Sequence, residues 1–275
     1  MHWNPWLIRM TAQPPRMRLF CFAYAGGSAF NFASWRAALH PSVEICALQL
    51  PGRGARIAEP PIASMQTLLK SMAPAVTQHS NLPFAFFGHS VGALIAFELA
   101  RYLRLHGVAG PQCLFMSGCQ APQFRSPSRQ LQRLPDAAFI EELRGYNGTP
   151  AEVLESSELM TLMLPAIRAD FALAENYAYR SGPLLQVPIS VYAGKQDDNK
   201  GAGQVEGWSK ETSASCRTTW FDEGHFFINT HRAAVLDQLN IELEELLEQR
   251  CVRSLGMEDA TRSANSSASS RPSFI

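Results

Sequence analysis

The chain has 275 residues, of which 46% are hydrophobic and 17% charged, and its 24 basic side chains balance its 24 acidic ones. This length suits one large domain, and a neutral balance lacks the clustered positive charge that binds nucleic acids or anionic membranes. No stretch approaches the roughly 18 consecutive apolar residues of a membrane span. Residues 1–6 do not read as a signal peptide. We therefore expect no nucleic-acid or membrane partner.

The cysteine pattern favours reduced thiols over disulfides or a metal site. The six cysteines are Cys21, Cys46, Cys113, Cys119, Cys216 and Cys251. None of them forms a C-x-x-C pair, and no histidine cluster accompanies them as zinc would require. Four lie in apolar or strand-like runs, where a free thiol packs as a small hydrophobic group. We expect a reducing, cytoplasmic location and neither a metal nor a cofactor.

Short apolar segments alternate with helical patterns along the chain. The predicted strands are 18–24, 43–48, 83–87, 112–117, 187–193 and 216–221. Helical spacing of apolar residues marks 32–39, 93–105 and about 231–249. This alternation predicts an α/β fold with a mostly parallel central sheet flanked by helices.

Residues 120–180 break the alternation, because they contain helical stretches and no convincing strand. The longest predicted helix covers 158–177, and Pro165 should bend or break it. We interpret this region as a helical lid insertion over the carboxyl edge of the sheet.

The expected domain is 17–250, with an N-terminal lead at 1–16 and a Ser-rich tail at 251–275. The tail has few large apolar residues to bury, so we expect it to be disordered.

Gly88-His89-Ser90-Val91-Gly92 matches the pattern G-x-S-x-G between a predicted strand and a predicted helix. In that context the motif forms a strained turn, the nucleophile elbow, which lifts the serine hydroxyl above the sheet. The competing interpretation is an ordinary strand–helix turn with a capping serine. The strand before the motif and the helix after it favour Ser90 as a nucleophile.

A serine nucleophile needs a base and an acid, which follow it in chain order in such folds. Of the seven histidines, only His225 and His231 come late enough. His225 lies in a loop after the last predicted strand, whereas His231 begins a helix, so His225 is the better base. Asp197 and Asp198 both follow the strand at 187–193 and are both candidates for the acid.

Acyl transfer also requires donors for the developing oxyanion. The backbone N–H of Val91 is one candidate, because it follows the nucleophile directly. The second should come from the glycine-containing loop 23–28, where we choose Ala25.

Over residues 17–250 the chain resembles the type II thioesterases of non-ribosomal peptide and polyketide synthesis, a family within the α/β-hydrolase superfamily. The motifs that carry this resemblance are Phe22-Ala23-Tyr24-Ala25-Gly26-Gly27-Ser28, Leu50-Pro51-Gly52-Arg53-Gly54, Phe87-Gly88-His89-Ser90-Val91-Gly92-Ala93, Ser117-Gly118 with Ala121-Pro122, Leu164-Pro165-Ala166-Ile167-Arg168-Ala169-Asp170, Gly194 with Asp197, and Gly224-His225-Phe226-Phe227. The pattern G-x-S-x-G marks only the superfamily, whereas Pro-Gly-Arg together with Arg-Ala-Asp is far more selective.

The resemblance implies hydrolysis of acyl or aminoacyl thioesters on the phosphopantetheine arm of acyl or peptidyl carrier protein domains. It implies that Asp197 is the acid and that 120–180 is the family's mobile lid. Tyr24 stands where many members carry His, and Asp198 stands where Pro commonly follows the acid. We expect a monomer, because an editing hydrolase has to visit many carrier domains.

Other motif residues have structural interpretations. Pro51 to Gly54 reads as a rigid turn, Arg168 and Asp170 as a pair across one helix turn, and His89 as a packing residue. Two other functions share the predicted fold. One is a general carboxylesterase or lipase-like hydrolase, and the other is a catalytically silent, hydrolase-like binding protein.

Overall fold

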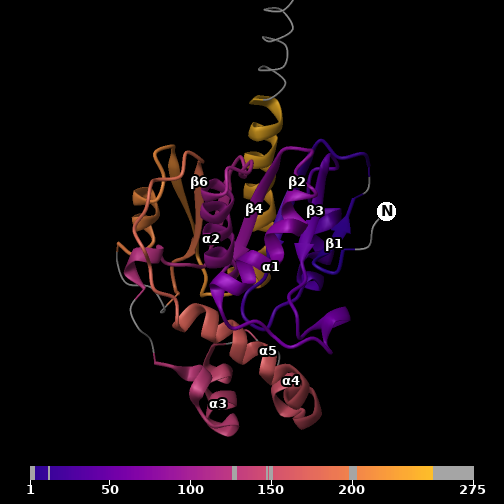
Figure 1. Cartoon of the computed structure of the whole chain (residues 1–275), viewed down its shortest axis with the longest axis vertical. Helices are drawn as coiled ribbons and strands as arrows, with labels where there is room; N and C mark the ends of the chain where they lie inside the picture. The colour runs from indigo at the N-terminus through magenta and orange to yellow at the C-terminus, as the bar shows by residue number, and fades with distance from the viewer. Residues whose placement is uncertain are drawn as a thin grey trace, which may run out of the picture.

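The computed structural model describes residues 4–11, 13–125, 129–146, 148, 151–197 and 203–249. Its centre is a sheet whose strands lie in the order β1-β3-β2-β4-β5-β6-β7 (Figure 1). The strands are β1 Leu7–Met10, β2 Met17–Phe22, β3 Val43–Leu48, β4 Phe84–His89, β5 Leu114–Ser117, β6 Ile189–Gly194 and β7 Cys216–Phe221. Strands β2 to β7 pair in parallel, as the sequence predicts.

Strand β1 is the one strand of the described sheet that the sequence did not predict. It pairs antiparallel with β3 at the edge of the sheet, with Leu7 opposite Leu48. Part of the predicted N-terminal lead therefore belongs to the sheet. Strands β2 to β6 are buried along their whole length, which is why their sequences are mostly apolar. The buried Arg18 of β2 and Glu44 of β3 form an ion pair with each other.

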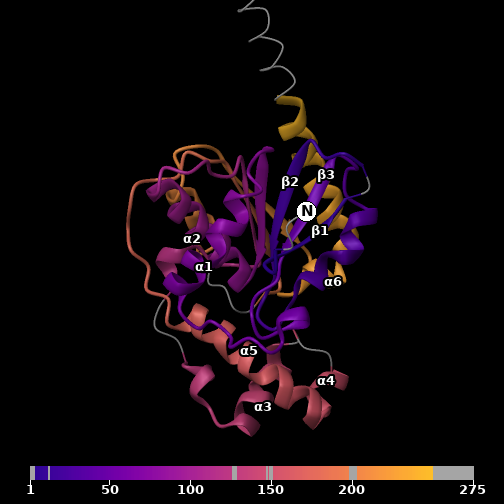
Figure 2. The same cartoon turned by 45° about the vertical axis from the view of Figure 1, so that its right-hand side comes forward.

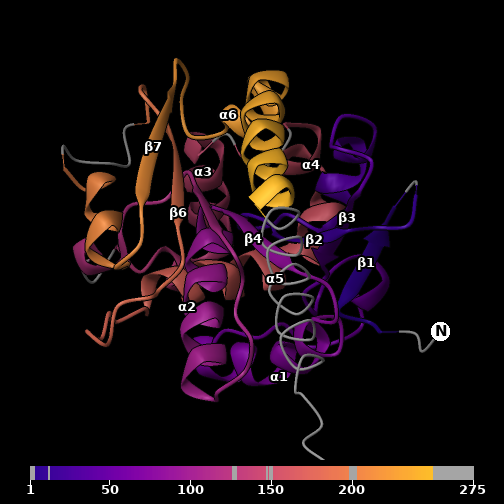
Figure 3. The same ribbon diagram turned by 90° about the horizontal axis from the view of Figure 1, so that it is seen from above.

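Helices cover both faces of the sheet (Figure 3). On one face lie α1 (Met65–Thr77) and α2 (Val91–Leu105), packed on Phe20, Phe86 and their neighbours. On the other lie the 3₁₀ segment η1 (Ala29–Ala37) and the C-terminal helix 232–249, in a core that includes Trp35 and Leu239. Further short 3₁₀ segments are η2 (Gly54–Arg56) and η5 (Glu206–Lys210), and α6 (Phe227–Thr230) follows β7.

The helical insertion follows β5 and precedes β6 in the chain, and it lies at one end of the sheet (Figures 1 and 2). Its elements are η3 (Pro122–Phe124), η4 (Leu131–Arg133), α3 (Asp136–Tyr146), α4 (Ala151–Glu155) and α5 (Ser157–Glu175). It has a small core of its own around Phe139, Leu143 and Leu164. Helix α5 continues through Pro165 without a break, so the alternative that this proline interrupts the helix is wrong.

The described thiols are unpaired and mostly buried. Cys21, Cys46, Cys113 and Cys119 are free and buried, and Cys216 is free and half-buried. Burial raises the pKa of Cys46 to about 12, and the pKa of Cys21 also rises well above its usual value. Cys251 and the predicted disordered tail lie outside the described residues. In the described part of the chain, no helix is both long and apolar enough to span a membrane.

Candidate active site

Ser90 lies in a strained turn between β4 and α2. Its backbone has φ 58° and ψ −121°, a conformation rarely adopted by a non-glycine residue. The two flanking glycines make this turn possible. A Cβ on Gly88 would stand 2.3 Å from the carbonyl oxygen of Gly92, and a Cβ on Gly92 would stand 2.2 Å from that of Phe22. The Ser90 N–H donates to the Ser117 carbonyl at 2.8 Å, which ties the turn to β5.

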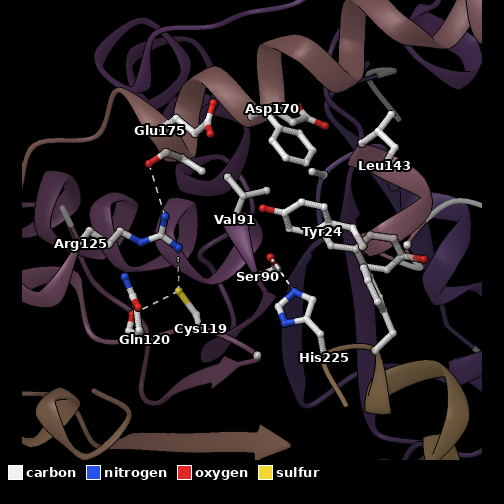
Figure 4. A pocket seen from close by; sticks show the side chains of 17 residues that line it. Tyr24, Ser90, Val91, Cys119, Gln120, Arg125, Leu143, Asp170, Glu175 and His225 are labelled. Carbon is white, nitrogen blue, oxygen red and sulfur yellow. Dashed lines mark hydrogen bonds between the residues drawn. The ribbon is translucent and has the colours of Figure 1, made fainter. Parts of the chain in front are cut away.

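A chain of hydrogen bonds runs from Ser90 through His225 to Asp197. The distance from Ser90 Oγ to His225 Nε2 is 3.1 Å (Figure 4). The distance from His225 Nδ1 to Asp197 Oδ2 is 2.7 Å. The Asp197 side chain is fully buried and that of His225 is 14% exposed. The structure thus brings together the three predicted catalytic side chains, which lie as far as 135 residues apart in sequence.

The loops after β6 and β7 bring Asp197 and His225 together because they pass very close to each other. A Cβ on Gly194 would stand 2.5 Å from the carbonyl oxygens of both Glu223 and Gly224. The Gln196 N–H donates to the Glu223 carbonyl at 3.0 Å. Only a glycine at position 194 permits this approach. The close packing fixes the loop after β6, which contains Asp197, against the loop after β7, which contains His225.

The other candidates from the sequence are arranged differently. His231 is 43% exposed on its side chain and faces Glu223 at 3.2 Å, at the surface. Asp198 lies outside the described residues. His89 is fully buried, its Nδ1 lies 2.9 Å from Ser117 Oγ, and its ring packs against Tyr24 and His225, which agrees with a packing residue.

Ser90 opens into a cavity of about 290 Å³ between the sheet and the helical insertion (Figure 4). The elbow, the loops after β2 and β5, and the histidine loop form one side, and the insertion forms the other. The lining residues are Tyr24, Ala25, Ser90, Val91, Gly118, Cys119, Gln120, Arg125, Leu143, Tyr146, Gly148, Asp170, Phe171, Ala174, Glu175, His225 and Phe226. Both predicted oxyanion donors, Ala25 and Val91, are therefore in the wall that contains Ser90.

The wall formed by the insertion mixes apolar and polar groups. Leu143 and Phe171 provide apolar surface, whereas the Arg125 guanidinium lies 3.4 Å from Cys119 Sγ and 3.4 Å from the Ala174 carbonyl oxygen. Burial raises the pKa of Tyr146 above its ordinary value. The cavity can thus hold a small acyl group and contact its polar atoms.

A second cavity of about 510 Å³ approaches His225 from the side of Asp197. It shares Tyr146, His225 and Phe226 with the first cavity, and polar residues including Arg129 and Gln196 line the rest. Within the described residues, no three His, Cys, Asp or Glu side chains gather as a metal site would need.

Arg53 and Asp170, both from motifs noted in the sequence, form a buried ion pair behind the loop that contains Ala25. Arg53 Nη1 lies 2.6 Å from Asp170 Oδ2, and Nη2 lies 2.8 Å from Oδ1. The expected pairing of Arg168 with Asp170 is wrong. Residues two apart on a helix point in different directions, and Arg168 instead binds Asp136 at 2.6 Å.

Sequence reasoning missed this pairing, although it singled out both motifs. The partners are 117 residues apart, and no local spacing connects them. It also missed that Asn31 Nδ2 donates to the Tyr24 hydroxyl at 2.8 Å. The signal available for the Arg53–Asp170 pair was the joint presence of two selective motifs, Pro-Gly-Arg and Arg-Ala-Asp, which the sequence analysis interpreted separately as a turn and as a local pair.

Comparisons with known proteins identify the family to which the chain belongs. Residues 17–243 match the model of the thioesterase domain family. The gramicidin S biosynthesis protein GrsT of Aneurinibacillus migulanus is 36% identical over 89% of this chain and 96% of its own length. The thioesterase PikA5 of Streptomyces venezuelae is 39% identical over 82% of this chain and 80% of its own.

Among solved structures, the type II thioesterase BorB from the borrelidin biosynthetic cluster superposes with a TM-score of 0.80. It is 35% identical, and the match covers 87% of this chain and 98% of BorB. The chain therefore belongs to the thioesterase family, and it is similar in sequence and fold to type II thioesterases of non-ribosomal peptide and polyketide pathways.

Proposed function

We propose that this chain is an editing thioesterase, which hydrolyses acyl or aminoacyl thioesters from the phosphopantetheine arm of carrier proteins in non-ribosomal peptide or polyketide synthesis. The observation that carries the proposal is the hydrogen-bonded series Ser90–His225–Asp197 at the wall of the cavity under the insertion. The similarity to type II thioesterases supports the choice of substrate.

In the acylation step, Ser90 Oγ attacks the thioester carbonyl while His225 Nε2 takes its proton. The buried Asp197 carboxylate holds Nδ1–H, which fixes the tautomer of the ring and stabilises the imidazolium. The Ala25 and Val91 N–H groups stabilise the oxyanion, each by about 3 kcal/mol if they act as oxyanion donors do elsewhere. The carbon–sulfur bond then breaks, and His225 returns the proton to the pantetheine sulfur.

In the deacylation step, water attacks the acyl-Ser90 ester while His225 again acts as the base. The acid leaves, and Ser90 regains its proton from the imidazolium. The same groups serve both halves, and no cofactor is needed. The polar cavity beside Asp197 and His225 offers water a path to the base.

The insertion fits the role of a lid, because α3 and α5 supply one wall of the cavity that contains Ser90. A cavity of about 290 Å³ suits a short acyl group better than a long chain. We propose that the protein acts as a monomer in the cytoplasm, where it meets its carrier domains.

The test is acid release from an acyl-loaded carrier protein, measured beside the matching acyl-coenzyme A and a p-nitrophenyl ester. The wild type should prefer the carrier by kcat/KM, and Ser90→Ala should lose turnover on all three substrates. His225→Ala should lose it as well, and the double variant should be no worse, because the two residues act as one unit.

Two outcomes would contradict the proposal in different ways. Rapid cleavage of the oxygen ester with the carrier ignored would make the protein a carboxylesterase. If the folded protein hydrolyses none of the three substrates, it is instead a binding protein that retains the residues of a hydrolase.

A further inference from the structure

A buried ion pair between the insertion and the loop after β3 makes hydrogen bonds to the turn that contains Ala25. Asp170 on α5 and Arg53 in the loop after β3 are 2% and 8% exposed, and their two side chains meet at 2.6 and 2.8 Å. Asp170 Oδ2 also accepts the Gly26 N–H at 2.8 Å, and Arg53 Nη1 donates to the Gly27 carbonyl at 3.0 Å. The pair thus contacts the two residues that follow Ala25 in the chain.

These contacts select one conformation of the turn. The Gly27 N–H donates to the Tyr24 carbonyl at 2.9 Å, and Gly26 has φ +76°, which together define a type II turn. Type I and type II turns differ by a flip of the central peptide, here the one between Ala25 and Gly26. Because the Asp170 carboxylate accepts the Gly26 N–H, it stabilises the type II orientation, and a flip would bring the Ala25 carbonyl oxygen toward a negative charge.

The position of this turn matters for the reaction. Ala25 and Asp170 both line the cavity that contains Ser90. An oxyanion donor is effective only if it is fixed before the charge develops, and a misplacement of about 1 Å can cost a factor of about 100 in rate. A buried contact on the adjacent peptide is well placed to provide that rigidity.

We propose that Asp170, itself held by Arg53, is a positioning residue for the oxyanion donor Ala25 N–H. The oxyanion hole is then complete only while α5 is docked, so the insertion takes part in catalysis as well as covering the substrate. This inference rests on the proposed function, because it takes Ser90 as the nucleophile. The alternative is that the ion pair only anchors α5 to the domain.

The first test is Asp170→Asn, which keeps the shape of the side chain but removes its charge. On an acyl-loaded carrier protein, we expect kcat to fall on the order of 10- to 100-fold while KM changes less than about threefold. A purely anchoring role predicts the reverse, a changed KM or a smaller folded fraction with normal kcat per folded molecule. Thermal unfolding of the same sample measures that fraction.

The second readout compares two pantetheine analogues. In the first, a trifluoromethyl ketone replaces the thioester: Ser90 Oγ bonds to its carbonyl carbon, the Oγ proton passes to His225, and the carbonyl electron pair becomes an oxyanion. In the second, an amide replaces the thioester and binds without forming an oxyanion. Asp170→Asn should weaken binding of the ketone analogue by about the same factor by which it lowers kcat/KM. Its affinity for the amide analogue should not change.

The matched control is Asp136→Asn, which removes an α3 carboxylate that pairs with Arg168 of α5. The Arg168–Asp136 pair joins α5 to α3, but the Asp136 side chain is 74% exposed and is not among the residues that line the cavity with Ser90 and Ala25. Its kinetics and both analogue affinities should match those of the wild type.

Arg53→Lys provides an independent variant if Asp170→Asn does not fold. A single ammonium cannot reach both carboxylate oxygens and the Gly27 carbonyl, so the same selective loss of kcat and ketone affinity is expected. Normal kcat and ketone affinity in a folded variant, or equal weakening of both analogues, would overturn the inference. If instead the wild type fails to hydrolyse the carrier thioester, the proposed function is what fails.

Discussion

At the scale of single residues, the proposed mechanism depends on one acid. The Asp197 side chain is fully buried, and its Oδ2 lies 2.7 Å from His225 Nδ1. In the proposed mechanism this contact keeps the proton on Nδ1, so that Nε2 faces Ser90 as the base. In a serine–histidine–aspartate system, an asparagine in place of the acid keeps the shape but favours the wrong tautomer.

We predict that Asp197→Asn lowers kcat by about 10⁴-fold while the protein stays folded. The neighbouring carboxylate supplies the control, because Asp198→Asn should leave kcat within about twofold of the wild type if it takes no part. Steady-state assays on an acyl thioester measure both. The assignment fails if Asp198→Asn is the damaging change and Asp197→Asn is not.

The sequence was most informative about single residues where a residue type and its chain position together left few choices. Ser90 was predicted from its place between a strand and a helix, and His225 from its place after the last strand. The structure brings Ser90 Oγ and His225 Nε2 within 3.1 Å of each other. The choice of Asp197 over Asp198 came from the family resemblance, and the structure adds the short contact to His225. The partner of Asp170 was not predictable, because it depends on how segments 117 residues apart pack.

At the scale of elements, the elbow between β4 and α2 depends on close backbone packing. Gly92 lies in the first turn of α2, where a Cβ would stand 2.2 and 2.5 Å from the carbonyl oxygens of Phe22 and Ala23. Those oxygens belong to the end of β2 and the following loop, and neither can move without disturbing the sheet. The glycine therefore sets the distance between the helix and the central strands.

We predict that Gly92→Ala destabilises the fold by about 3 kcal/mol, the upper end of overpacking costs, and abolishes turnover. Gly110→Ala is the matched control, because a Cβ there meets nothing within 4 Å, and it should change stability by less than about 0.5 kcal/mol. Urea unfolding of both variants measures this difference. Equal midpoints for the two would show that the close approach at Gly92 is not a real constraint.

Elements with buried, continuous apolar runs were predicted well, and the exceptions have physical reasons. Strand β1 is only four residues long, is exposed at Ile8 and Arg9, and lies at an antiparallel edge, so it lacks the apolar run of its neighbours. Helix α5 tolerates Pro165, contrary to the expectation that this residue might interrupt it. Tertiary packing of Leu164 and Ile167 into the core of the insertion stabilises the helix around that residue.

At the scale of the whole molecule, helices on both faces enclose the central strands so fully that the thiols of Cys21 in β2 and Cys46 in β3 lose contact with water. Burial raises the pKa of Cys46 to about 12 from an ordinary value of 9.0. Below pH 9 this thiol is protonated in both the folded and the unfolded chain. Between pH 9 and 12 it ionises only in the unfolded chain, which then binds fewer protons, so the free energy of unfolding falls as pH rises.

We predict that the free energy of unfolding decreases steadily above pH 9, with Cys46 contributing up to about 1.4 kcal/mol per pH unit. Denaturant unfolding at several pH values measures the slope. In Cys46→Ala the slope should be smaller by that amount. An unchanged slope would mean that the Cys46 thiol reaches solvent in the native protein.

The most direct measurement of the central claim is a search for the acyl-enzyme. The protein is mixed with an acyl-loaded carrier, quenched in acid within one turnover, and analysed by intact mass and peptide mapping. We predict one acyl group per chain, attached to the peptide that contains Ser90 and absent in Ser90→Ala. An acyl group on another residue, such as Cys119 in the same cavity, or normal hydrolysis by Ser90→Ala, would contradict Ser90 as the nucleophile.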